Sequence, residues 1–93
     1  MQNKTGYVSL NPDDFILYPN PVTDKLYIIT PGDIGTIEYS IQDAAGRIAL
    51  KGSMPSGENE ISTGGLKQGS YIIRFNGSLG RKSYKVEKSV RIP

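Results

Sequence analysis

Short apolar runs, interrupted at regular intervals by glycine and proline, are the feature that most restricts how this chain can fold. The sequence contains 11 glycines and 6 prolines. They separate runs rich in β-branched and aromatic residues at intervals of about 8 to 12 residues, the spacing expected of strands in a sandwich or barrel. No stretch sustains the 3.6-residue period of an amphipathic helix. We therefore expect an all-β protein.

Three segments give the clearest strand predictions. Residues 25–30 and 69–76 are rich in β-branched and aromatic side chains, and each is followed by a turn that contains glycine. Residues 37–52 predict a β-hairpin, because apolar and polar residues alternate along its first half and residues 43–46 supply a turn that ends in glycine.

The remaining runs are shorter and complete the predicted architecture. They predict an edge strand at 15–18, a loop at 54–57, a brief strand at 59–62 and a last strand at 81–86. Strands that are apolar on one face cannot bury that face in a single sheet, so they must form two facing layers. The predicted fold is an immunoglobulin-like β-sandwich of about seven antiparallel strands over residues 14–93, preceded at residues 1–13 by a linker or cloning remnant.

The segment from Leu66 to Tyr71 predicts a tyrosine corner, since an apolar residue and Gly69 precede a tyrosine at the start of a strand. In such a corner the phenol hydroxyl reaches back to an upstream backbone group and holds the crossover between layers. The predicted role is structural rather than chemical.

Composition excludes most catalytic and metal chemistry. The chain has no cysteine and no histidine, which excludes disulfides, thiol nucleophiles, imidazole bases and ordinary zinc sites. Seven of the nine acidic residues fall at predicted turns or outward strand positions, and no calcium-loop pattern occurs. The net charge is only +2, and no apolar run approaches the ~20 residues that span a bilayer. We expect no catalytic residue, cofactor, metal, nucleic-acid partner or membrane insertion.

Residues 81–91 carry five of the eleven positive charges, interleaved with Tyr84, Val86 and Val90. This pattern predicts a last strand with one apolar and one cationic face. Two interpretations remain open. The charges either discourage edge-to-edge aggregation of an edge strand or form a recognition strip for a partner.

Several short motifs follow one another in a fixed order. They are Tyr18-Pro19-Asn20-Pro21-Val22, Leu26 to Ile28, Asp43-x-x-Gly46-Arg47, Asn59-x-Ile61, Leu66-x-x-Gly69-x-Tyr71-x-Ile73 and a lysine-rich last strand. Together, from Phe15 to about Lys88, they resemble the type A C-terminal sorting domain of the type IX (Por) secretion system. By motif match, the signature positions are Pro19, Asn20, Pro21, Asp43, Gly46, Arg47, Leu66, Gly69, Tyr71, Lys85 and Lys88.

The resemblance implies a non-catalytic signal domain at the end of a larger exported protein of a Gram-negative bacterium. Its partners would be the N-terminal cargo domain of the same parent chain, the type IX secretion machinery and a surface sorting peptidase that commonly removes the domain. The parent would pass through the periplasm, cross the outer membrane and be secreted or held at the cell surface.

Two other functions compete with this one. A carbohydrate-binding or adhesion module would use an exposed aromatic platform drawn from Tyr7, Tyr18, Tyr27, Tyr39 and Tyr84. A purely structural spacer is the third hypothesis.

Overall fold

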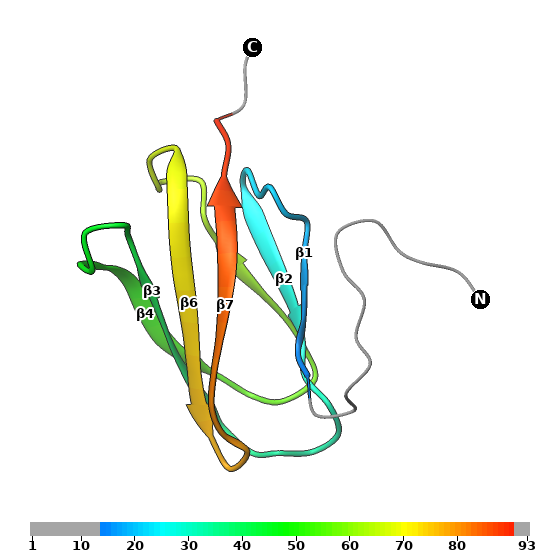
Figure 1. The fold of residues 1–93 in the computed structure, drawn as a ribbon. Helices are drawn as coiled ribbons and strands as arrows, with labels where there is room; N and C mark the ends of the chain where they lie inside the picture. The colour runs from blue at the N-terminus through cyan, green and yellow to red at the C-terminus, as the bar shows by residue number, and fades with distance from the viewer. Residues whose placement is uncertain (1–13, 91–93) are drawn as a thin grey trace.

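Seven strands form two facing antiparallel sheets in the computed structural model, which describes residues 14–90 (Figure 1). In chain order they are β1 (Ile16–Tyr18), β2 (Lys25–Ile29), β3 (Ile37–Gln42), β4 (Ile48–Met54), β5 (Glu58–Ser62), β6 (Gly69–Gly77) and β7 (Gly80–Lys88). The smaller sheet has the order β1-β2-β5 and the larger sheet the order β4-β3-β6-β7. The predicted all-β, immunoglobulin-like sandwich is confirmed. The segment 1–13 lies outside the described residues.

Apolar residues at alternate strand positions fill the space between the sheets. On β6, Tyr71, Ile73 and Phe75 are buried, and β3 presents Ile37 and Ile41 in the same way. The pairing of β3 with β6 sets Ile41 opposite Ile73, so the two strands share one apolar surface. Full burial of one such side chain stabilises the fold by about 1.5–3 kcal/mol.

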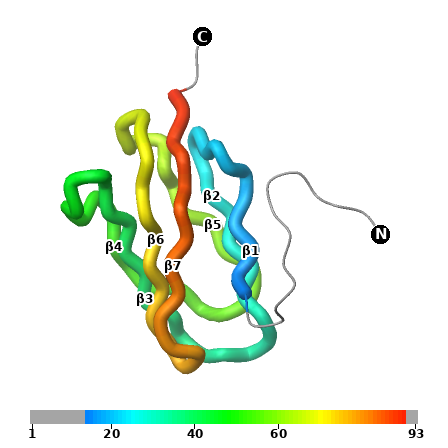
Figure 2. The backbone as a smooth tube through the Cα atoms, viewed as in Figure 1, coloured from blue at the N-terminus to red at the C-terminus, as the bar shows by residue number. Residues whose placement is uncertain are grey.

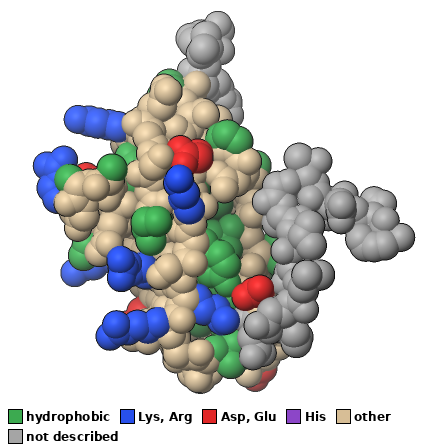
Figure 3. All heavy atoms as spheres, viewed as in Figure 1, with side chains coloured by type: hydrophobic (Ala, Val, Ile, Leu, Met, Phe, Trp, Pro, Cys, Tyr) green, Lys and Arg blue, Asp and Glu red, His purple; other side chains and the backbone are tan. Residues whose placement is uncertain are grey.

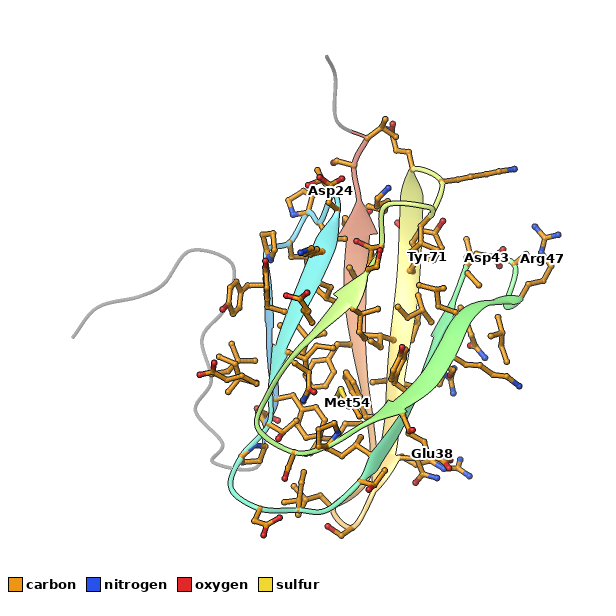
Figure 4. All side chains as sticks on the ribbon, turned by 180° about the vertical axis from the view of Figure 1, so that it is seen from behind. Asp24, Glu38, Asp43, Arg47, Met54 and Tyr71 are labelled. Carbon is orange, nitrogen blue, oxygen red and sulfur yellow. The ribbon has the colours of Figure 1, made fainter. Side chains whose placement is uncertain are left out.

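Met54 corrects one predicted boundary. It was expected to begin a loop, but it pairs with Ile37 and ends β4. Its side chain is only 6% exposed and lies between the sheets (Figure 4). Burial of this side chain extends the strand, and Pro55, which has no amide hydrogen to donate, follows directly after it.

The edge strands β1 and β7 of the two sheets lie on the same side of the sandwich (Figure 2), and residues that flank β1 bond to β7 at both ends of the seam between them. At one end of this seam, the Phe15 amide donates a hydrogen bond to Tyr84 Oη over 2.9 Å. The Phe15 ring packs on Phe75, with centroids 4.7 Å apart. Burial raises the pKa of the Tyr84 phenol above its usual value of 10.0. Asp14 and Lys82 form an ion pair of 3.9 Å across the same end.

Candidate functional site

The Pro19-Asn20-Pro21 motif closes the other end of the seam. The Asn20 amide nitrogen donates to the Lys85 carbonyl over 3.2 Å, and the Glu87 amide donates to Asn20 Oδ1 over 2.9 Å. One side chain therefore satisfies a carbonyl and an amide on the outer edge of β7. The peptide bonds that precede Pro19 and Pro21 are both cis.

Val22 extends this contact with its backbone. Its amide donates to the Glu87 carbonyl and its carbonyl accepts from the Ser89 amide, both over 2.8 Å. These bonds form a short parallel bridge between Val22 and Lys88, and the Val22 side chain is buried. β7 is an edge strand of the larger sheet, but Asn20 and Val22 cover the end of its outer edge that runs from Lys85 to Ser89.

The Asp43-x-x-Gly46-Arg47 motif forms the turn of the β3–β4 hairpin, where Asp43 and Arg47 lie side by side (Figure 4). Asp43 Oδ1 accepts hydrogen bonds from the amides of Ala45, over 3.0 Å, and of Arg47, over 2.9 Å. The bond from the Arg47 amide is the main cause that lowers the pKa of Asp43 below 3.8. Gly46 has a φ of +87°, a conformation that L side chains rarely adopt.

The predicted tyrosine corner is confirmed. Tyr71 Oη donates a 2.7 Å hydrogen bond to the Lys67 carbonyl, four residues upstream, in the loop that carries the chain from the smaller sheet to the larger one. Gly69 has a φ of +151°, so a side chain at this position would strain the backbone although the space is open. Leu66 is half-buried and packs against the core.

Lys85 and Lys88 have opposite surroundings although they belong to one predicted cationic strand. Lys85 is exposed and forms a 3.8 Å ion pair with Glu87. Lys88 is 5% exposed, and its ammonium group donates a 2.7 Å hydrogen bond to the Leu66 carbonyl. Lys82 shares this inward face, so the predicted separation into an apolar and a cationic face is wrong. Arg91 lies outside the described residues.

The tyrosines do not gather into one exposed platform. Tyr18 and Tyr27 stack on each other across β1 and β2, with centroids 5.3 Å apart. Tyr39 and Tyr84 pack instead against the core. Tyr7 lies outside the described residues.

Sequence reasoning missed one feature, a hollow of about 660 Å³ on the outer face of the larger sheet. Strand pairing brings Lys51, Arg74 and Arg81 to it from β4, β6 and β7. In the sequence, each of these three residues looks like an ordinary surface charge. Only the strand order and register, which no local pattern reveals, place the three side chains together.

Within residues 14–90, no group of three or more acidic, cysteine or histidine side chains could hold a metal ion. The same part of the chain contains no helix that is both long and apolar enough to cross a membrane.

The motif residues thus interact mainly with the backbone of the protein itself, and the structure is that of a small immunoglobulin-like β-sandwich module. Residues 16–89 match the sequence model of the secretion system C-terminal sorting domain, and the chain belongs to this family. This membership defines the domain as a type IX secretion signal carried by a larger cargo chain, and it implies association with the type IX machinery and export to the cell surface or secretion. A search of curated proteins finds no match.

Proposed function

We propose that this domain is a non-catalytic signal that the secretion machinery recognises through its folded shape and its surface charge. Its cargo passes through the periplasm and crosses the outer membrane, and a surface sorting peptidase then removes the domain. The observation that carries the proposal is that the motif residues of this family member hold the sandwich together by binding backbone atoms. Such contacts define one rigid outline, which a receptor can read by shape and charge complementarity.

The first test fuses residues 11–93 to a reporter protein that carries its own periplasmic export signal. In a bacterium with a type IX system, the reporter should appear at the cell surface or in the medium, and a mass decrease of the exported reporter should mark removal of the domain. A reporter that remains in the periplasm would refute the proposal. A fusion without residues 11–93 serves as the control.

Arg47 allows recognition to be separated from folding. Its side chain is 82% exposed, and its only ion pair within the described residues is with Asp43 at 3.3 Å. An exposed pair of this kind contributes little to stability. Arg47→Ala should therefore fold normally. If the folded variant is not exported, Arg47 belongs to the recognition surface, whereas normal export limits it to bracing the turn.

The stacked Tyr18–Tyr27 pair favours a second candidate function, carbohydrate binding on the outer face of the smaller sheet. The alternative predicts glycan-array binding that Tyr18→Ala and Tyr27→Ala abolish. Unchanged glycan binding in both variants would exclude these rings as the platform.

A further inference from the structure

The hollow on the larger sheet is built from two rows of paired residues. One row runs across all four strands as Lys51, Ser40, Arg74 and Ser83. The neighbouring row contains Ser53, Glu38, Asn76 and Arg81 in the same strand order. All eight side chains belong to the outward face, because the alternate residues Tyr39, Phe75 and Lys82 face inward and Gly52 pairs with Tyr39.

The hollow has an excess of positive charge that the described residues do not neutralise. Lys51, Arg74 and Arg81 are exposed, and none of them forms an ion pair within residues 14–90. Glu38 is the one acidic residue among those lining the hollow. Figure 3 shows Lys and Arg side chains gathered on the side of the molecule where the larger sheet lies. Exposed charges without partners add little to stability, so folding does not explain this cluster.

We propose that this hollow binds an acidic, extended segment of a protein partner. The inference rests on the proposed function, since the segment would belong to the machinery that recognises the domain. Arg74 and Arg81 are diagonal neighbours on adjacent strands, which places their side chains about 7 Å apart. Alternate side chains of an extended peptide are also about 7 Å apart. Two carboxylates at alternate positions can therefore each meet one guanidinium group, in the two-bond geometry that arginine favours.

The lining favours a peptide over an anionic glycan. Phe75 and Tyr39 contribute to the walls of the hollow, but Phe75 is buried and Tyr39 packs against the core. The lining therefore offers no exposed aromatic face on which a sugar ring could stack. Ser40, Ser53 and Asn76 supply neutral donors and acceptors between the cations, as a peptide backbone requires.

The first experiment measures binding of a fluorescein-labelled peptide that alternates glutamate with serine, using the full chain and fluorescence anisotropy. Arg74→Gln combined with Arg81→Gln should weaken binding by at least about tenfold, because two charge-assisted contacts are lost. Lys25→Gln combined with Lys67→Gln removes the same charge from other surfaces and should leave binding nearly unchanged. Equal weakening by both pairs would overturn the proposal, as would dextran sulfate binding that depends on the two arginines while the peptide does not bind.

The second experiment repeats the reporter export assay with the same variants. The arginine-to-glutamine pair should fold, export much less reporter than the parent domain and regain part of the export when both positions carry lysine. The control pair should export normally. If the parent domain is exported and the arginine-to-glutamine pair is exported equally well, this inference fails and the proposed function stands. If the parent domain itself is not exported, the proposed function fails.

Discussion

Replacement of Asn20 by alanine tests whether the Pro19-Asn20-Pro21 motif stabilises the fold. The change removes two hydrogen bonds, from the side-chain amide to the Lys85 carbonyl and from the Glu87 amide to Oδ1. Each bond contributes about 0.5–1.5 kcal/mol. Asn20 is exposed, so water can replace its side chain, and we expect a total loss of about 1–2 kcal/mol. For a domain of this size, each kcal/mol lowers Tm by about 4–8 °C.

The assay combines urea unfolding with hydrogen exchange at the Glu87 amide. Asn20→Ala should lower the free energy of unfolding and accelerate this exchange. Asn76→Ala is the matched control, because Asn76 is exposed and lies on the outer face of β6, and it should change stability by no more than about 0.5 kcal/mol. Asn20→Asp keeps one acceptor but turns an oxygen toward the Lys85 carbonyl, so it should destabilise at least as much as alanine. If Asn20→Ala unfolds like Asn76→Ala and the Glu87 amide remains protected, the reasoning is wrong.

Three further predictions address the other motifs. Tyr71→Phe should lose about 1 kcal/mol in urea unfolding, because its hydroxyl bond to the backbone disappears. Lys88→Gln should lose more stability than Lys85→Gln in the same assay, since Lys88 is buried on a carbonyl and Lys85 is exposed; equal losses would contradict the assignment. Hydrogen bonds to the ionised Asp43 carboxylate lower its pKa in the folded state, so they stabilise the fold fully when the pH is above the unfolded pKa of 3.8. This contribution disappears as the pH falls through the folded pKa. Asp43→Asn should therefore flatten the acid limb of the stability curve, and an unchanged limb would refute this.

The features that the sequence predicts well depend on residues that are close together along the chain. The alternation of Ile37, Tyr39 and Ile41 identified β3 and its inward face, because residues two apart on a strand point to the same side. The tyrosine corner was also predictable, since Tyr71 bonds only four residues back. Local patterns therefore specify strands and turns.

Features that join distant segments were not predicted. Asn20 contacts Lys85 and Glu87, 65 and 67 residues away, and no property of Asn20 alone indicates which strand edge it meets. The burial of Lys88 is different, because the sequence did indicate it. Lys88 is two residues from Val86 and four from Tyr84, so all three side chains point to the inward side of β7. Its positive charge suggested exposure, but a buried lysine is compatible with the fold when a carbonyl accepts a hydrogen bond from its ammonium group.

Three motif residues hold the fold together through contacts that do not depend on the side chains of their partners. Asn20, Tyr71 and Lys88 all bind backbone atoms, and every residue type supplies a backbone carbonyl. These contacts therefore place no requirement on the outward side chains of the strands that they join. We therefore expect mutations at these three positions to reduce export mainly by loosening the fold, whereas mutations of Arg74 and Arg81 should reduce it in a protein that remains fully folded. Measuring stability and export on the same variants separates these two effects.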